Sequence, residues 1–250
     1  EAVQTNIQGT INLVDCSEAY KVERFVLVST DKAVNPTNIM GASKRVAEQI
    51  IQARSVDTGV KYMAVRFGNV IGSSGSVIPT FQEQIKNGGP VTITDPNIKR
   101  YFMSIPEAAQ LILQAGSIGR GGEIFVLDMG EPVLIKDIAI ELIKLSGFTP
   151  DVDIPIDYIG LRPGEKMFEE LITKGENITD SPHEKIMILK NEVKHGWNRT
   201  LAESERVVIS SKTYNVDLIK KSLIKIVPEY SPAKQEKDNL DIFEKQNQKF

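Results

Sequence analysis

The chain has 250 residues, of which 41% are apolar, 25% are charged and 6% are aromatic. This composition excludes collagen-like, low-complexity and disordered proteins. The 30 basic and 33 acidic residues give a formal charge of −3, so no overall positive field favours nucleic acid or anionic lipid as a partner. No apolar run approaches the roughly 20 residues that cross a bilayer. There is one cysteine, Cys16, so a disulfide within the chain is excluded and a reducing, cytoplasmic location is expected. The two histidines leave few ligands for a metal.

Hydrophobic spacing predicts alternating helices and strands over residues 1–150. The predicted helices cover residues 2–20, 36–55, 79–86, 106–115 and 135–146. The predicted strands cover residues 22–30, 60–67, 91–94, 101–105 and 123–127, and we expect the first of them to be buried on both faces. This alternation indicates an α/β fold, a parallel sheet with crossover helices.

After residue 150 the pattern changes. A strand over 154–159, a turn over 161–165 and a short helix over 167–172 precede a more polar region that extends to about residue 227. We expect residues 151–227 to form a smaller C-terminal subdomain that binds the substrate. Residues 228–250 contain few apolar side chains and predict a weakly ordered tail.

Polar side chains gather where the first predicted strand ends. Ser29, Thr30, Asp31 and Lys32 are consecutive there, and ligands of open α/β sheets bind at the carboxyl ends of the strands. Taken alone, these four residues are better explained by an aspartate that caps a helix beside a solvated lysine. The next predicted helix favours a functional site, because its Lys44 can point toward the same strand end.

Several segments together resemble the extended short-chain dehydrogenase/reductase superfamily, and within it the nucleotide-sugar 4,6-dehydratases of the polysaccharide-biosynthesis branch. The matching segments are NIQGTIN (6–12), STDKA (29–33), MGASKR (40–45), RFGNVIGSSGSVIP (66–79), GGPVTITDP (88–96), RYFMSIPEA (100–108) and LRPGEK (161–166). The resemblance extends from about residue 6 to residue 189. It implies a Rossmann-type fold, a UDP-sugar as substrate, and NAD or NADP as cofactor.

One residue departs from the pattern of the superfamily. Met40 stands where the catalytic tyrosine is usual, and a thioether neither donates nor accepts a proton at the sugar C4 hydroxyl. A subset of the non-inverting UDP-N-acetylglucosamine 4,6-dehydratases is similar to this chain in having methionine there. We therefore expect an active dehydratase of UDP-N-acetylglucosamine, with more of the chemistry carried by the Thr-Asp-Lys triplet.

Dehydration of a hexose defines the groups that such a site must supply. Oxidation at C4 needs a nicotinamide that takes up hydride, and elimination of water needs a base at C5 and an acid at the C6 hydroxyl. By resemblance, Thr30 contacts the C4 oxygen, Asp31 protonates the leaving hydroxyl and Lys32 removes the C5 proton. Lys44 holds the nicotinamide ribose, with Met40 and Val70 beside the cofactor.

The resemblance also implies which residues bind the nucleotide-sugar. Guanidinium groups match phosphate oxygens bidentately, so two arginines are expected at the diphosphate or uridine, and a glutamate at the ribose hydroxyls. The expected set is Asn69, Ser74, Val77, Arg100, Arg162 and Glu165. Because Arg162 and Glu165 are three residues apart, an alternative for this pair is a structural ion pair.

A nicotinamide-dependent enzyme needs a first βαβ unit with a G-x-G-x-x-G turn and an acidic residue about 20 positions later. The sequence contains neither. We therefore expect the C-terminal part of a longer protein, inactive alone and with one exposed sheet edge. By analogy, the parent is anchored at the cytoplasmic face of the inner membrane, and the helices at 2–20 and 36–58 form an interface between identical subunits.

Two other functions stay open at this point. A nucleotide-sugar 4-epimerase shares the oxidation at C4 but needs no acid at C6, so the Asp31–Lys32 pair favours a dehydratase. A non-catalytic module that binds a UDP-sugar would fit Met40 and the missing first unit. Binding without turnover in a full-length protein would favour that module.

Overall fold

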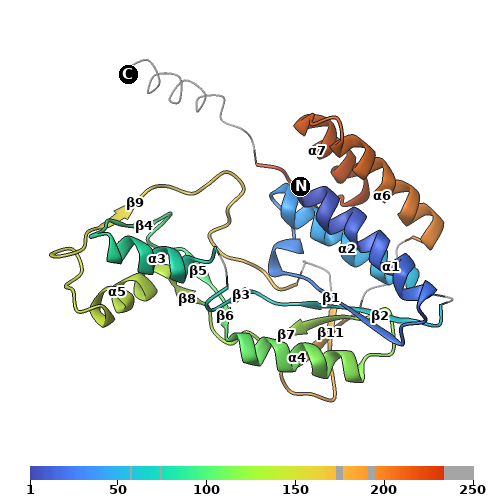
Figure 1. Cartoon of the computed structure of the whole chain (residues 1–250), viewed down its shortest axis with the longest axis horizontal. Coiled ribbons are helices and arrows are strands. Elements are labelled where there is room, and N and C mark those ends of the chain that lie inside the picture. The colour runs from blue at the N-terminus through green and yellow to red at the C-terminus, as the bar shows by residue number, and fades with distance from the viewer. Residues whose placement is uncertain (57, 74, 173–176, 191–194, 234–250) are drawn as a thin grey trace.

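The computed structural model describes residues 1–56, 58–73, 75–172, 177–190 and 195–233. Its largest sheet has five strands in the order β1-β2-β7-β11-β10 (Figure 1). Their bounds are β1 (Arg24–Val28), β2 (Lys61–Arg66), β7 (Ile124–Leu127), β10 (Asn177–Asp180) and β11 (Ile186–Lys190). β1, β2 and β7 are parallel, with Val26 opposite Met63, whereas β11 and β10 are antiparallel. The predicted α/β class with a parallel central region is confirmed.

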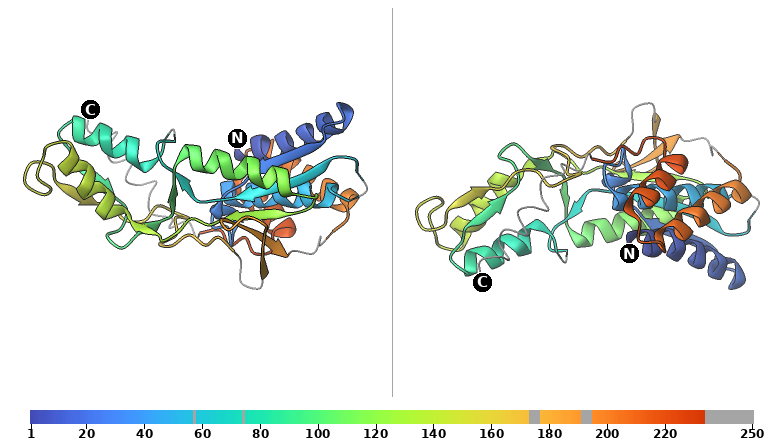
Figure 2. Two further views of the ribbon diagram at one scale, coloured as in Figure 1. Left: turned by 90° about the horizontal axis from the view of Figure 1, so that it is seen from below. Right: turned by 90° about the horizontal axis from the view of Figure 1, so that it is seen from above.

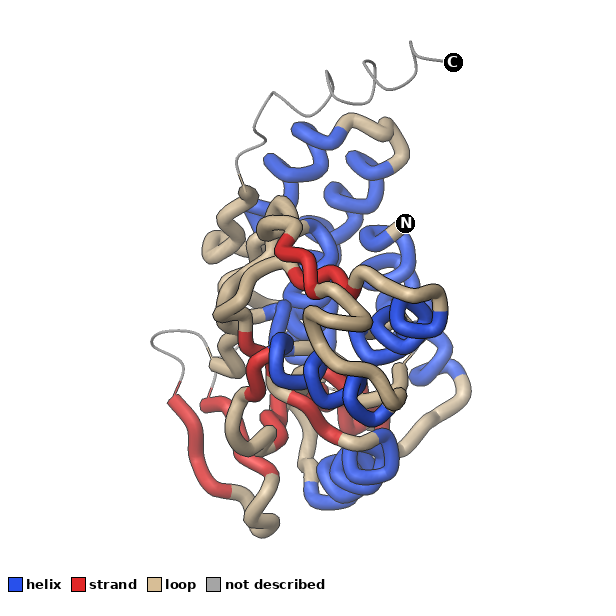
Figure 3. Tube along the Cα trace, turned by 90° about the vertical axis from the view of Figure 1, so that its left-hand side faces the viewer, coloured by secondary structure: helices blue, strands red, loops and turns tan. Residues whose placement is uncertain are grey.

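Helices cover both faces of this sheet, as Figure 1 and the view along the long axis in Figure 3 show. On one face lie α1 (Gly9–Ala19), which follows a π-helical turn η1 (Gln4–Gln8), and α2 (Ile39–Arg54). On the other face lies α4 (Ile105–Ile118). Each face of the sheet has its own apolar cluster: Val46 and Ile50 of α2 pack with Tyr62 on one face, and Leu111 of α4 packs with Phe125 on the other. The sheet thus has the two-sided cover of a doubly wound fold.

A C-terminal helical hairpin adds a further layer over α2. Helices α6 (Trp197–Ser211) and α7 (Val216–Ile226) contribute Val207 and Leu223 to the same apolar cluster as α2. The chain then continues along α2, where Tyr230 is buried and the Ser231 amide donates to the Pro36 carbonyl at 3.0 Å. Residues 228–233 therefore pack against the first lobe. The weakly ordered tail expected over residues 228–250 stays a prediction, and its residues 234–250 lie outside the described residues. The hairpin also covers part of the surface expected between subunits, and the oligomeric state stays a prediction.

A second group of elements forms a lobe of its own (Figure 2). Its helices and strands are α3 (Val77–Lys86), β4 (Val91–Ile93), β5 (Lys99–Arg100), β8 (Val133–Leu134), α5 (Ile135–Leu145) and β9 (Ile156–Tyr158). Phe81, Ile93 and Ile143 belong to its separate apolar core. Short strands β3 (Asn69–Val70) and β6 (Phe102–Met103) pair where the two lobes meet.

Packing groups the elements differently from the predicted division at residue 150. The second lobe combines segments from both sides of that position, since β4 pairs with β9. Strands β10 and β11 and the hairpin α6–α7 join the first lobe instead, because β11 pairs with β7 and the hairpin packs on α2. Sequence order is a poor guide here because both lobes are completed by segments distant along the chain.

Three predicted elements differ from those observed. Helix α2 begins at Ile39 rather than residue 36, because the Asn38 side chain caps it by accepting from the Gly41 amide at 2.8 Å. β1 is only half-buried, since it is an edge strand of the described sheet. The predicted helix at 167–172 is absent: the Met167 carbonyl accepts from Lys99 and the Leu171 carbonyl from Arg66, so tertiary partners replace helical ones.

Gly41 lies where α2 crosses the 3₁₀ turn η2 (Asp31–Ala33), and a Cβ there would overlap the Lys32 carbonyl. A backbone carbonyl cannot rotate away, so Gly41→Ala must displace the helix or the turn. We expect a loss of about 1–3 kcal/mol in the free energy of unfolding, measured by urea denaturation. Gly59→Ala is the control, because no atom lies within 4 Å of its Cβ position. Equal losses in the two variants would contradict this account.

Candidate functional site

The candidate site begins where β1 ends. After Val28 the chain turns into η2, and the Asp31 amide donates to the Phe67 carbonyl at 3.0 Å, which ties the turn to the end of β2. Thr30 caps this turn through its hydroxyl, which accepts from the Lys32 amide at 3.4 Å. The parallel pairing of β1 and β2 therefore brings Thr30 and Lys32 beside the loop that follows β2.

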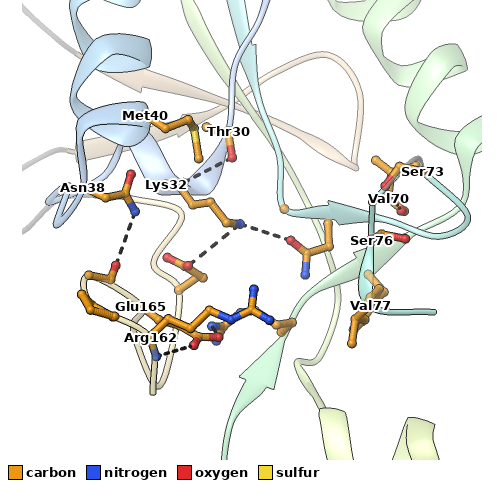
Figure 4. Close-up of a pocket in the computed structure, with 18 residues that line it drawn as sticks. Thr30, Lys32, Asn38, Met40, Val70, Ser73, Ser76, Val77, Arg162 and Glu165 are labelled. Carbon is orange, nitrogen blue, oxygen red and sulfur yellow. Dashed lines mark hydrogen bonds and ion pairs between the residues drawn. The ribbon is translucent and has the colours of Figure 1, made fainter. Parts of the chain in front are cut away.

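Lys32 is the centre of the polar contacts in the site (Figure 4). Its Nζ donates to Asp31 Oδ1 at 3.0 Å and to Asn69 Oδ1 at 3.2 Å, and lies 3.9 Å from Glu169 Oε1. The side chain is 27% exposed, so the amine is held from three sides while it still faces the pocket. A constrained amine next to carboxylates is suited to proton transfer.

Asp31 lies behind Lys32 rather than in the pocket. Its side chain is fully buried and is absent from the pocket lining. Oδ1 accepts from Thr30 Oγ1 at 2.9 Å and from Lys32 Nζ, while Oδ2 is buried without a hydrogen-bond partner among the described residues. The carboxylate thus orients the hydroxyl and the amine.

The pocket has a volume of about 780 Å³, within the roughly 300–1,000 Å³ typical of small-molecule sites. It opens between the two lobes, with Lys32 and Met40 on one side and Val77 on the other (Figure 4). Of the residues that we predicted to bind substrate or cofactor, those that line it are Met40, Asn69, Val70, Val77, Arg100, Arg162 and Glu165. Ser74 lies outside the described residues.

The predicted nucleotide-binding residues form one wall of the pocket. Arg100 is buried and its Nη2 lies 3.3 Å from Glu165 Oε1, which also accepts from Thr94 Oγ1 at 3.2 Å. Glu165 Oε2 accepts from the Arg162 backbone amide at 3.1 Å. The structural ion pair considered for Arg162 and Glu165 is not present in the described part of the chain, where the Arg162 guanidinium makes no salt bridge. Its charge is exposed to the pocket, as a phosphate partner requires.

Lys44 lies apart from this group. It reaches the end of β1 as predicted, but its Nζ donates to the Val28 carbonyl at 3.2 Å and it does not line the pocket. Burial lowers the pKa of Lys44, although the nearby Glu48 charge raises it in part. The helical spacing of Met40 and Lys44 places both on the strand-facing side of α2, and only Met40 extends to the pocket.

Glu169 is a site residue that sequence reasoning missed. Its side chain is 6% exposed, lines the pocket, and has one oxygen, Oε2, buried without a hydrogen-bond partner among the described residues. Burial raises its pKa; the Lys32 charge lowers that pKa, and the Asp31 charge raises it. The segment 167–172 seemed helical from its composition, and nothing in its spacing distinguishes Glu169 from the exposed Glu170.

A second missed feature is a buried ionic network behind the site. Glu48 of α2 accepts from Ser29 at 2.6 Å, from Arg66 at 3.0 and 2.7 Å, and from Arg45 at 2.9 Å. These contacts connect α2 with the ends of β1 and β2. They fix the helix that carries Met40 and Lys44 relative to the turn that carries Lys32.

Two other kinds of site are missing from the described residues. No group of three or more histidine, cysteine, aspartate or glutamate side chains is placed to hold a metal ion within that part of the chain. Of the helices described, none combines the length and apolarity that a membrane crossing demands.

Comparisons with known proteins show the family of this chain and solved structures that share its fold. A family model described as "Polysaccharide biosynthesis protein" matches residues 1–191. The capsular polysaccharide biosynthesis protein CapD of Staphylococcus aureus is 54% identical over 187 residues, which are 74% of this chain and 31% of CapD. The crystal structure of Pen from Bacillus thuringiensis superposes with a TM-score of 0.70 at 37% identity, covering 76% of this chain and 60% of Pen.

A more distant structure shares the fold. The dTDP-glucose 4,6-dehydratase of Bacillus anthracis, solved in complex with NAD, superposes with a TM-score of 0.56 at 22% identity, covering 64% of this chain and 57% of that one. The chain therefore spans about a third of CapD and less than two thirds of either solved structure. The hairpin α6–α7 lies beyond the residues that the family model matches.

Proposed function

Because the chain belongs to the polysaccharide biosynthesis protein family, whose model matches residues 1–191, we propose that it carries the sugar site of a nucleotide-sugar 4,6-dehydratase. The proposed reaction converts UDP-N-acetylglucosamine to its 4-keto-6-deoxy product for a surface polysaccharide or glycan. The observation that carries this proposal is the Lys32 amine, held between Asp31 and Asn69 inside a pocket whose other wall presents Arg100 and Arg162.

The two ends of the pocket match the two ends of such a substrate. Arg162 offers a guanidinium to the diphosphate, and Glu165, fixed by Arg100, offers a carboxylate oxygen to ribose hydroxyls. The hexose then lies toward Lys32 and Thr30. Thr30 Oγ1 is positioned to contact the C4 oxygen, and Lys32 to take the C5 proton once C4 is a carbonyl.

The proposal includes NAD or NADP as cofactor. The residues present fit the nicotinamide ribose: Lys44 lies half-buried at the carboxyl end of β1, and its described hydrogen bond goes to a backbone carbonyl rather than to a carboxylate. The amine is therefore available to ribose hydroxyls, and Met40 and Val70 line the pocket. A nicotinamide cofactor, when bound, supplies hydride uptake from C4 and hydride return to C6.

The groups in this site favour a dehydratase over a 4-epimerase. A 4-epimerase needs only the redox step at C4, so it has no use for a base and an acid beside C5 and C6. Here the Lys32 amine lies close to two carboxyl groups, 3.0 Å from Asp31 Oδ1 and 3.9 Å from Glu169 Oε1. We also propose a cytoplasmic location and assembly with identical subunits.

The test uses the full-length product of the gene, incubated in D₂O with UDP-N-acetylglucosamine and NAD. The expected product has lost one water, carries a C6 methyl group and contains deuterium at C5, as read by mass spectrometry and NMR. Inversion at C4 without loss of water would assign an epimerase instead. Binding of the UDP-sugar in calorimetry without any turnover would assign a non-catalytic module.

A further inference from the structure

The turn that carries Arg162 and Glu165 has partners in both lobes. On the side of the second lobe, Glu165 Oε1 accepts from Thr94 Oγ1 at 3.2 Å and lies 3.3 Å from Arg100 Nη2. The turn is also closed on itself, because the Glu165 amide donates to the Arg162 carbonyl at 2.9 Å. These contacts hold the proposed nucleotide-binding residues on the second lobe, but they do not place them relative to Lys32 in the first lobe.

The first lobe contacts this turn through the loop that precedes α2. Thr37 Oγ1 donates to the Gly164 carbonyl at 2.6 Å, and the Asn38 side-chain amide donates to the same carbonyl at 3.4 Å (Figure 4). Gly164 has a φ of +79°, and a Cβ there would lie 3.0 Å from the Thr37 carbonyl oxygen. The turn and the loop are therefore in direct contact, and the Thr37 hydroxyl makes the shorter of the two hydrogen bonds between them.

A C-terminal strap, residues 229–233, contacts the same loop. The Ala233 amide donates to the Thr37 carbonyl at 3.3 Å. At the other end of the strap, Glu229 pairs with the buried Arg45 of α2 at 2.9 Å. The strap lies beyond the residues that the family model matches. It ties the loop that carries Thr37 to the first lobe.

We propose that Thr37 is a positioning residue for the substrate: it holds the 162–165 turn at a fixed distance from the Lys32 end of the pocket, and the C-terminal strap holds Thr37. This inference rests on the proposed function, in which Arg162 and Glu165 bind the nucleotide and the hexose lies toward Lys32. Thr37 itself does not line the pocket, so it acts on the spacing between these two binding regions. A UDP-sugar occupies both regions at once, whereas UDP occupies only the nucleotide region.

The test compares Thr37→Val with Thr37→Ser in the full-length gene product. Valine keeps the shape of threonine and removes the hydroxyl, whereas serine keeps the hydroxyl that donates to Gly164. We expect Thr37→Val to lower kcat/KM for UDP-N-acetylglucosamine about 10-fold. The affinity for UDP, measured by calorimetry, should stay within about twofold of the wild type, because the turn keeps its partners in the second lobe. Thr37→Ser should match the wild type in both measurements.

Thr213→Val is the matched control. The Thr213 hydroxyl also donates to a backbone carbonyl, that of Ser210 at 2.8 Å, but it does so in the hairpin α6–α7. Thr213→Val should therefore leave both kcat/KM and the affinity for UDP unchanged.

Three results would overturn the proposal. Unchanged kcat/KM in Thr37→Val would show that the turn is placed without this hydrogen bond. Loss of UDP affinity together with kcat/KM would show that the variant damages the turn itself rather than its spacing from Lys32. Equal losses in Thr37→Ser and Thr37→Val would show that the hydroxyl is not the group that matters.

Two truncated forms of the gene product test the strap. A chain that ends after Tyr230 lacks the Ser231 and Ala233 amides, which donate to the loop before α2, and a chain that ends after Ala233 keeps both. We expect kcat/KM of the shorter chain to be about 10-fold below that of the longer one, with the same affinity for UDP. The same kinetics in both chains, active or inactive, would overturn the role of the strap.

These outcomes are distinct from failure of the proposed function. A wild-type protein that forms no dehydrated product would refute the dehydratase. Calorimetry of UDP and UDP-N-acetylglucosamine needs no turnover, so the role of Thr37 can be tested in that case too. An unchanged ratio of the two affinities in Thr37→Val would then refute the role of Thr37 separately.

Discussion

Glu48→Gln is expected to lower the free energy of unfolding by about 3–5 kcal/mol, because it removes the carboxylate that Arg66 and Arg45 share in the core. Glu48 and Arg66 are both fully buried, so water cannot replace the lost charge. The measurement is urea unfolding at neutral pH, followed by circular dichroism.

Surface carboxylates should behave very differently. Glu141 pairs with Lys144 on α5 at 3.0 Å, but both side chains are more than half exposed. Glu141→Gln should therefore change the free energy of unfolding by less than about 0.5 kcal/mol. A loss below about 1 kcal/mol in Glu48→Gln would contradict the view that this network holds the first lobe together.

The same carboxyl group predicts sensitivity to acid. Burial raises the pKa of Glu48, but the charge and hydrogen bonds of Arg66, the charge of Arg45 and the hydroxyl of Ser29 outweigh it and lower the pKa from 4.5 to about 2. A carboxyl group with a lower pKa in the folded state stabilises the fold at pH above its unfolded pKa. That contribution, about 3 kcal/mol, should disappear as pH falls from 4.5 to 2. Glu48→Gln should show a weaker pH dependence over this range.

The sequence predicts the part of the site that is local along the chain. Thr30, Asp31 and Lys32 follow a strand of a parallel sheet, and the carboxyl ends of neighbouring strands meet, so Lys32 and Asn69 were predictable neighbours. The segment matches also placed Arg100, Arg162 and Glu165 together.

Residues that depend on reach or burial were less predictable. Spacing assigns Lys44 to a helix face, but it does not tell whether the amine extends to the pocket or stops at the Val28 carbonyl. Spacing likewise treats Glu48 as a polar position, although its charge is compensated by Arg66 from a strand 18 residues away. The charge closest to Glu169 belongs to Lys32, which is more than a hundred positions earlier in the chain. Composition alone suggested a helix around Glu169.

The two lobes illustrate the same limit at a larger scale. The alternation of strands and helices was enough to predict the α/β class. It could not tell that β4 pairs with β9 or that the hairpin α6–α7 returns to α2. Both pairings join distant segments, the first through a strand ladder and the second through apolar contacts, and many helices and strands would satisfy either. The pocket lies at the junction that these long-range contacts create.

Lys32→Met is expected to lower both C5 proton exchange and water loss about 10³-fold in the full-length protein, because it removes the amine and keeps a side chain of similar length. Deuterium uptake at C5 and product formation are the two measurements. Affinity for UDP should be retained, since Arg100 and Arg162, which also line the pocket, are the proposed partners of the nucleotide. Lys185→Met is the control: this lysine pairs with Glu107 on the surface at 2.8 Å and is not part of the pocket.

The pattern across the two measurements carries more information than either rate alone. Removing the base at C5 prevents formation of the carbanion, so Lys32→Met loses exchange and elimination together. Exchange that persists in Lys32→Met would show that another group takes the C5 proton, and the amine held between Asp31 and Asn69 would then have no part in moving it.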